Sequence, residues 1–188
     1  MILPIHVYGS PVLQEPTIPV KENTPELQEL IDNMLETMHG ASGIGLAAPQ
    51  VGRSERLFVV DVSPLVKEEP GLPEDPLVFI NPQITEEGDM DEEYEEGCLS
   101  IPDLREYIVR PESVSVTFLD RDFNEKHLEV DGMLARVIQH EYDHLEGILF
   151  IDHISSFKRR LMRRRLKDMI NGKVQADYPI YTWENQGA

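Results

Sequence analysis

The residues with the clearest chemical potential form the segment His140-Glu141-Tyr142-Asp143-His144. Side chains four positions apart lie one turn above another on a helix, so His140 and His144 can reach the same metal ion. Glu141 lies about 100° around the helix from His140, where its carboxylate can touch a water molecule on the ion without being a ligand. Asp143 lies on another face and is expected to be a surface or helix-orienting carboxylate. The segment therefore predicts a helix that binds a divalent cation for hydrolysis.

The same five-residue pattern also arises by chance on solvated helices. Here the surrounding residues are apolar, since they include Leu134, Val137, Ile138 and Leu145. A pair of histidines that faces a hydrophobic core needs a partner for its polar nitrogens. The apolar context therefore favours a metal site over a chance occurrence.

Two histidines leave a tetrahedral metal site incomplete, so a third ligand is required. Downstream, the extended zinc-protease pattern fails at Phe150. Glu146 is too near the second histidine to fold back, and His153 has an unfamiliar spacing. Upstream, Cys98 is the only cysteine of the chain. Most free cysteines are small buried hydrophobic residues, but a coordinated thiolate best explains a lone thiol among so many carboxylates. We therefore predict Cys98 as the third ligand.

Several elements must position these residues. Thr24 is expected to cap a helix from Pro25 to Gly40, with apolar residues at helical spacing. The small-residue segment 43–50 (GIGLAAPQ) follows, and its backbone can approach a neighbour closely. Residues 63–75 are a Pro-rich loop. Strands at the spacing of an antiparallel sheet are expected over residues 56–62, 77–84, 104–109, 113–119 and 126–130.

Two further helices complete the prediction. Asp131 can cap a helix over about 133–145, with Gly147 beyond its end. A final helix is expected over 156–170. One helix, a run of strands and then more helices predict an α+β fold, with antiparallel sheets around the central metal-binding helix and with an N-terminal and a C-terminal helix. We expect one catalytic domain over residues 1–172 and a C-terminal tail over 173–188.

Charge and composition exclude some classes of protein. The net charge of −18 argues against DNA binding by the whole surface. The charge is uneven, because residues 86–96 hold eight acids, expected on a solvated face, whereas 158–167 hold seven bases. No apolar run is long enough for a membrane span. The first six residues resemble no secretory signal, and a lone cysteine suits a reducing compartment. We expect a cytoplasmic protein.

Three ordered motifs make the chain similar to the peptide deformylase family, of bacterial type. They are residues 43–50 (GIGLAAPQ), 96–100 (EGCLS) and 139–145 (QHEYDHL), and with flanking segments the resemblance covers about residues 6–155. Segments 63–75 and 173–188 are not part of the shared pattern. The resemblance implies removal of the formyl group from the N-terminal formyl-methionine of newly made polypeptides, which gives formate and a free amino terminus.

The resemblance also implies a role for each site residue. Cys98, His140 and His144 would bind one divalent ion, which is iron(II) in the family, with zinc, nickel or cobalt able to substitute. Glu141 would be the acid–base catalyst, and the Gln50 side chain and the Leu99 N–H would stabilise the oxyanion. The substrate-binding residues would be Ile44, Gly45, Gly97, Arg105, Leu134 and Val137, with Arg105 tied to Glu96.

The resemblance and the basic run suggest two partners. The substrate would be an N-formyl-methionyl nascent peptide, so the basic helix 158–167 could dock on ribosomal RNA. The alternative is an amphipathic helix that buries Phe157, Leu161, Leu166 and Ile170.

Two other functions compete with deformylation. A zinc protease would share the helix but needs a downstream third ligand, and a metal-stabilised binding domain would need no acid–base residue. Gln50 could likewise serve only to hydrogen-bond the nearby loop backbone.

Overall fold

The structure is a computed structural model and describes residues 1–183. Its helices are α1 (Pro25–Gly40), α2 (Gly132–Leu145) and α3 (Ser156–Ile170), and short 3-10 turns occur in several of the connections. The α+β prediction is confirmed. The strands are β1 (Ile5–His6), β2 (Gly45–Ala47), β3 (Leu57–Val60), β4 (Leu77–Glu87), β5 (Asp91–Cys98), β6 (Ile101–Pro111), β7 (Ser113–Leu119), β8 (Glu125–Asp131) and β9 (Ile180–Tyr181).

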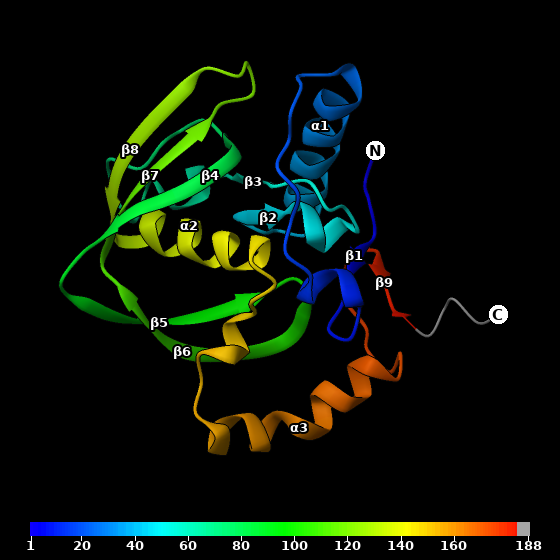
Figure 1. Ribbon diagram of the computed structural model, residues 1–188. Coiled ribbons are helices and arrows are strands. Elements are labelled where there is room, and N and C mark those ends of the chain that lie inside the picture. The colour runs from blue at the N-terminus through cyan, green and yellow to red at the C-terminus, as the bar shows by residue number, and fades with distance from the viewer. Residues whose placement is uncertain (184–188) are drawn as a thin grey trace.

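Helix α2 lies between two antiparallel layers (Figure 1). One layer is a five-stranded sheet of order β2-β3-β4-β7-β8, and the other is the β5–β6 hairpin. The short strands β1 and β9 pair in parallel near the N-terminus (Figure 1). Within residues 1–183, no helix is both long and apolar enough to cross a membrane. The arrangement encloses the helix of the His-Glu motif, as its apolar sequence predicted.

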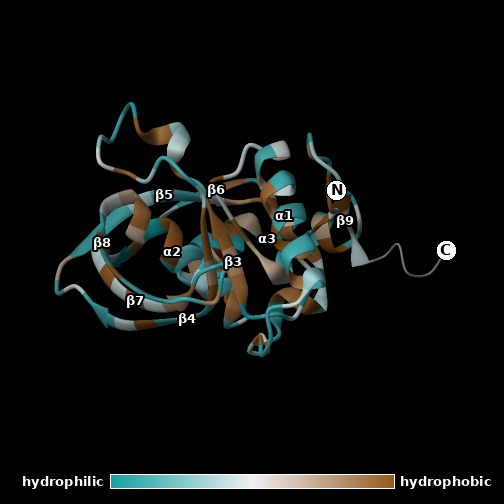
Figure 2. Ribbon diagram, turned by 90° about the horizontal axis from the view of Figure 1, so that it is seen from above, coloured by the Kyte–Doolittle hydropathy of each residue, from teal (hydrophilic) through white to brown (hydrophobic). Residues whose placement is uncertain are grey.

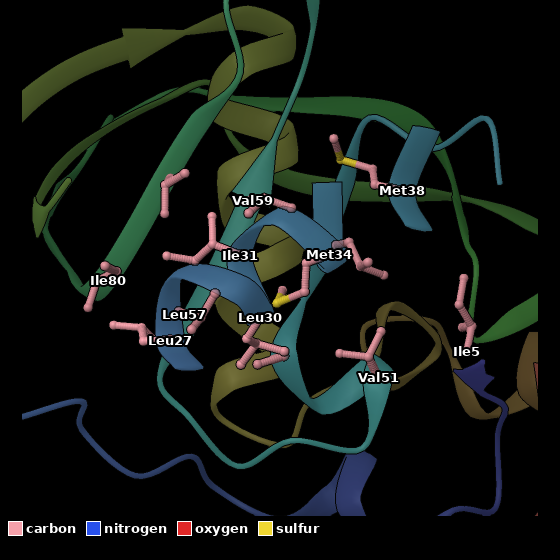
Figure 3. Close-up of a cluster of buried hydrophobic side chains, with 13 residues drawn as sticks. Ile5, Leu27, Leu30, Ile31, Met34, Met38, Val51, Leu57, Val59 and Ile80 are labelled. Carbon is pink, nitrogen blue, oxygen red and sulfur yellow. The ribbon is translucent and has the colours of Figure 1, made fainter. Parts of the chain in front are cut away.

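Helix α1 forms as expected from its cap and its apolar spacing. The Thr24 hydroxyl accepts a hydrogen bond from the Leu27 N–H at 3.2 Å, and Pro25 occupies the first turn. The buried residues of α1 point towards β3 and β4 (Figure 3). Their side chains meet Leu57, Val59 and Ile80, which are buried in the same core. This core fixes β2, which is the neighbour of β3, against the rest of the molecule.

A second core lies between α2 and the five-stranded sheet. Ala135, Ile138 and Leu145 are fully buried there. They face a row of phenylalanines, in which Phe58 and Phe79 stack with ring centroids 4.6 Å apart. Strand β3 is hydrophobic along its length (Figure 2) because both of its faces are covered. Burial of each large apolar side chain in this core contributes roughly 1.5–3 kcal/mol, so the core holds α2 firmly against the five-stranded sheet.

The structure corrects several element predictions. The acidic run 86–96 is mostly solvated as expected, but it forms the end of β4 and the first six residues of β5, which no alternation of apolar residues indicated. Strands β2, β1 and β9 were also missed, because two or three residues carry too little pattern. Asp131 is the N-cap residue of α2, yet its side chain makes no capping hydrogen bond.

The alternative in which the basic helix packs as an amphipathic helix is wrong for Phe157, Leu161 and Ile170, which are exposed. Leu166 is buried in α3 as expected, together with Met169. Phe157 and Leu161 instead remain 66% and 71% exposed. Helix α3 reaches the core beside β6 through Met162, Leu166 and Met169, whereas its first turn projects from the body (Figure 1).

Candidate metal centre

Three side chains from two elements converge at the face of α2 that turns away from the large sheet. The ligand atoms that Cys98, His140 and His144 can offer all lie within 4.8 Å of one another. The Cys98 Sγ and His144 Nε2 atoms are 3.3 Å apart. This is near the roughly 3.5 Å expected between a sulfur and a nitrogen ligand of one tetrahedral ion. The donor set therefore fits a single divalent cation.

Cys98 reaches the histidines because it is the last residue of β5. Leu99 and Ser100 form the turn that leads into β6, and the strand register shifts between Gly97 and Cys98. Burial raises the pKa of the Cys98 thiol, but the positive imidazoles of His144 and His140 more than offset this and lower it to about 5. The thiolate that a metal requires is thus available at neutral pH.

The Glu141 carboxyl lies against the backbone of Gly45. A Cβ atom built on Gly45 would lie 2.8 Å from the Glu141 Cδ atom, so only glycine leaves room for the carboxyl group. Glu141 is 4% exposed, and its Oε2 atom has no hydrogen-bond partner among residues 1–183. Burial raises the pKa of Glu141 to about 7, against the opposing effect of both histidines. A buried carboxyl with a vacant oxygen and such a pKa suits proton transfer near neutrality.

Gln50 is oriented by its own loop. Its side-chain oxygen accepts a hydrogen bond from the Ala47 N–H at 2.8 Å. Its amide nitrogen consequently faces the site and donates to Ser100 Oγ at 3.3 Å and to Cys98 Sγ at 3.5 Å. The hydrogen bond between Gln50 and the loop backbone, which was the alternative role for this residue, is therefore present. It also directs the side-chain N–H donor of Gln50 towards the metal centre.

A buried charge network supports His140. The Glu96 carboxylate accepts from the Nδ1 atom of His140 at 2.9 Å, which leaves Nε2 for the metal. Arg110 binds both oxygens of Glu96, at 2.7 and 3.1 Å, and Arg136 donates to Oε1 at 3.0 Å. Burial raises the pKa of Glu96, but His140 and Arg110 hold it well below its ordinary value. Such outer contacts fix the ring orientation of a ligand histidine.

The two arginines were missed by sequence reasoning. Arg136 lies four residues before His140, so both share one face of an otherwise apolar helix. A charge at such a position requires a buried partner, and that signal could have identified it. No comparable signal marks Arg110, because the residues beside it on β6 alternate between the two faces of the strand and belong to no motif.

The predicted tie between Arg105 and Glu96 is wrong. Arg105 is exposed, and its Nη1 atom lies 3.7 Å from the Oε2 atom of Glu95. Arg105 meets Glu95 rather than Glu96 because successive side chains of β5 point to opposite faces. The downstream ligand candidates are also engaged elsewhere. Glu146 pairs with Arg56 at 2.6 Å, and His153 pairs with Asp143 at 2.7 Å. The third ligand of a zinc protease is therefore not found at these two positions.

Asp143 is a helix-orienting carboxylate. Besides His153, it accepts a hydrogen bond from Arg110 at 2.7 Å. Burial raises the pKa of Asp143, but His153 and Arg110 more than offset this and lower it. Through Arg110, Asp143 is joined to the same network as Glu96.

A cleft of about 1340 Å³ opens over the metal centre. Most predicted site residues line it: Ile44, Gly45, Gln50, Gly97, Cys98, Leu99, Arg105, Val137, His140 and Glu141. His144 lies beneath, 1% exposed, and Leu134 belongs to the core between α2 and the sheet. Tyr94, Met133, Arg136 and several residues beyond 173 also line the cleft and were not predicted.

A buried Cys-His-His group, a glutamate with a free oxygen and an open cleft define a metal-dependent hydrolase of the α+β class. Comparison with known proteins narrows this class. The family model described as polypeptide deformylase matches residues 2–160. A peptide deformylase of Salinibacter ruber is 59% identical over 191 residues, which cover 99% of this chain and 97% of that protein. One of Christiangramia forsetii is 46% identical over 188 residues, with coverage of 96% and 95%.

Solved structures agree with the sequence comparison. The crystal structure of a peptide deformylase from Legionella pneumophila is similar with a TM-score of 0.80 at 39% identity, and covers 89% of this chain and 95% of that one. The deformylase of Ehrlichia chaffeensis in complex with actinonin gives 0.82 at 35% identity, with coverage of 93% and 99%. The chain belongs to the peptide deformylase family. It is a metal-dependent hydrolase that removes the formyl group from the N-terminal formyl-methionine of new polypeptides.

Replacement of Glu96 by glutamine is expected to weaken metal binding by about 10–100-fold. Glutamine keeps the size of the side chain but removes the charge that orients His140 and balances Arg110 and Arg136. Metal affinity is measured by competition with a chelator. The control is Glu95→Gln on the exposed face of β5, which should leave the affinity unchanged. Equal affinity in both variants would contradict this role.

The same substitution should change the response to acid. The pKa of Glu96 lies below its unfolded value of about 4.3. Ionised Glu96 therefore stabilises the fold above that pH, and the contribution is lost as the pH falls through the folded pKa. Unfolding of metal-free Glu96→Gln, followed by circular dichroism, should depend less on pH below about 4.

Replacement of Gly45 by alanine is expected to lower kcat by about 10²-fold. The added methyl group displaces the Glu141 carboxyl from its position against the Gly45 backbone. Bound metal should remain at the wild-type amount. Gly40→Ala serves as control, since a Cβ there would lie 3.4 Å from Ile2. An active Gly45→Ala protein would show that the close approach does not position Glu141.

Proposed function

We propose that deformylation is carried out by Glu141, Gln50 and the Leu99 N–H, beside an ion held by Cys98, His140 and His144. The observation that carries this assignment is the buried Glu141 carboxyl, whose Oε2 atom has no partner in the described chain. This carboxyl is close enough to His140, His144 and Cys98 to interact electrostatically with all three. When bound, a divalent ion supplies Lewis acidity and lowers the pKa of water from about 15.7 towards 7.

Glu141 moves the proton in both halves of the reaction. Its Oε2 atom accepts the proton of the attacking water and later returns it to the leaving nitrogen, which produces formate and a free amine. A group with a pKa of about 7 can perform both transfers at neutral pH. The Gly45 backbone behind the carboxyl keeps it directed into the cleft.

Two donors face the oxygen on which negative charge develops. The Gln50 amide nitrogen is directed into the site by the Ala47 N–H, which holds the side-chain oxygen. The Leu99 N–H belongs to the turn directly after Cys98. Loss of one such donor typically raises the barrier by about 2.7–4 kcal/mol.

The remaining site residues bind the substrate. Gly45 and Gly97 would lie along the peptide backbone, and Arg105 at the exposed rim of the cleft. Ile44 and Val137 would wall the methionine pocket, supported from the core by Leu134. Crowding around Gly45 would admit a formyl carbon, which bears only hydrogen, and exclude an acetyl group.

The metal in the cell would be iron(II), with zinc, nickel or cobalt able to substitute. Cysteine and histidine ligands accept all four ions, and affinity alone favours zinc over iron(II), so iron(II) is implied by the family rather than by affinity. The oxygen-sensitive thiolate of Cys98 would then require a reducing compartment, in agreement with a cytoplasmic location.

Residues 1–172 would form the catalytic domain, and its basic helix would dock on the ribosome. Phe157 and Leu161 are exposed on α3 beside Arg160, Arg163 and Arg164, which form no ion pair with residues 1–183. Lys158 and Arg159 are partly neutralised by Glu106 and Asp152. Co-sedimentation with ribosomes that weakens as salt rises would support docking, whereas absent or salt-insensitive binding would end the idea.

One experiment tests the catalytic proposal. Protein prepared without oxygen is incubated with a formyl-Met peptide, and formate and bound metal are measured on the same sample. We expect formate in proportion to one bound ion per chain. Equal cleavage of the N-acetyl-Met peptide would contradict the steric selection at Gly45.

A further inference from the structure

The C-terminal tail returns to the cleft after α3. The chain turns at Gly172, whose φ of +67° favours glycine. Residues 174–178, here called the tail wall, then line the same cleft as the metal centre. The family model matches residues 2–160, so the tail wall lies outside the matched residues.

The far end of the tail is fastened to the N-terminal strand. The Ile5 N–H donates to the Pro179 carbonyl at 2.9 Å, and the Val7 N–H donates to the Tyr181 carbonyl at 3.1 Å. The rings of His6 and Tyr181 stack 4.2 Å apart. Strand β9 thus fixes the far end of the tail wall beside β1 (Figure 1).

A single side chain ties the tail wall to the catalytic turn. The Tyr178 hydroxyl donates to the Leu99 carbonyl at 2.8 Å, and the ring packs against the core around α1. Among residues 1–183, this is the one hydrogen bond that residues 174–178 make. The turn itself is held independently, because the Tyr8 N–H donates to the Ser100 carbonyl at 2.8 Å. Tyr178 therefore positions the tail wall on the turn.

The cleft must also hold the peptide that follows the formyl-methionine. An extended chain advances about 3.3 Å per residue, so the second and third residues leave the metal centre through the cleft. The tail wall offers them Val174 and Ala176, which are half-buried and apolar, along one side. Formyl-methionine alone has no second or third residue, so it does not extend from the metal centre along the tail wall.

We infer that the tail wall is a specificity-determining surface for the second and third residues of the substrate, and that Tyr178 is its positioning residue. This inference rests on the proposed function. It separates two contributions to binding: the metal centre and methionine pocket act on every substrate, and the tail wall acts on longer peptides.

The test compares formyl-Met amide with formyl-Met-Ala-Ser on metal-loaded full-length protein. Ala176→Leu narrows the cleft, and the ratio of KM for the tripeptide to KM for the amide should rise roughly tenfold. Tyr178→Phe removes only the hydroxyl, and the same ratio should rise about threefold to tenfold with kcat little changed, the equivalent of one hydrogen bond. Tyr181→Phe on β9 is the control and should keep the wild-type ratio.

The outcomes separate the two proposals. A wild-type ratio in both Ala176→Leu and Tyr178→Phe would overturn the tail wall while leaving deformylation intact. If Ala176→Leu fails to fold, the ratio for Tyr178→Phe decides alone. Unaltered protein that releases no formate from either substrate would overturn the proposed function and the tail wall with it.

Discussion

The Glu141→Gln protein is expected to retain one bound metal ion and to lose about 10²–10⁴-fold in kcat. Glutamine matches the shape of the buried side chain but cannot accept the proton of the attacking water. The metal is unaffected because the ligand atoms come from Cys98, His140 and His144. Formate release is measured under anaerobic conditions, and metal content on the same preparation.

The matched control is Glu146→Gln at the end of the same helix. Glu146 pairs with Arg56 outside the cleft, so its loss should leave kcat and metal content unchanged. Wild-type kcat in Glu141→Gln would remove the acid–base role. A metal-stabilised binding domain, by contrast, would release no formate even from the unaltered protein.

Replacement of Cys98 by alanine is expected to abolish metal binding and activity together. Two histidines do not complete a tetrahedral site, and without the ion the water is no longer activated, so kcat should fall by roughly 10³-fold or more. Metal content after dialysis and formate release are measured on one sample. Glu141→Gln is the comparison, because it separates lost chemistry from lost metal.

The Cys98 result also distinguishes the deformylase from a zinc protease. A protease with a downstream third ligand would keep its ion in Cys98→Ala. The contacts of Glu146 and His153 with Arg56 and Asp143 argue against such a ligand. A fully metallated Cys98→Ala protein would nevertheless overturn the assignment.

Some features follow from local chemistry and were predictable. Thr24 and Pro25 define the start of α1, and the predicted bounds of α3, 156–170, agree with the structure. The position of the His-Glu motif on a helix follows from the apolar spacing around it. The pairing of Cys98 with two distant histidines came from chemical suitability and family resemblance, because local pattern cannot bring together residues that are 42 and 46 positions apart.

Other features depend on long-range packing. The exposure of Phe157 and Leu161 could not be predicted, since it depends on how far α3 extends beyond the body. The choice of Glu95 over Glu96 by Arg105 depends on strand register, and a one-residue difference reverses the face of a side chain.

The sequence by itself determined which groups can do the chemistry: one thiol, two imidazoles at helical spacing and a carboxylate between them. Tertiary structure decided their environment, since burial against Gly45 sets the pKa of Glu141 and two buried arginines hold Glu96 on His140. It also decided that Tyr178 meets Leu99. The physical reason is that donor types are properties of residues, whereas desolvation and contact belong to neighbours that the chain brings together only on folding.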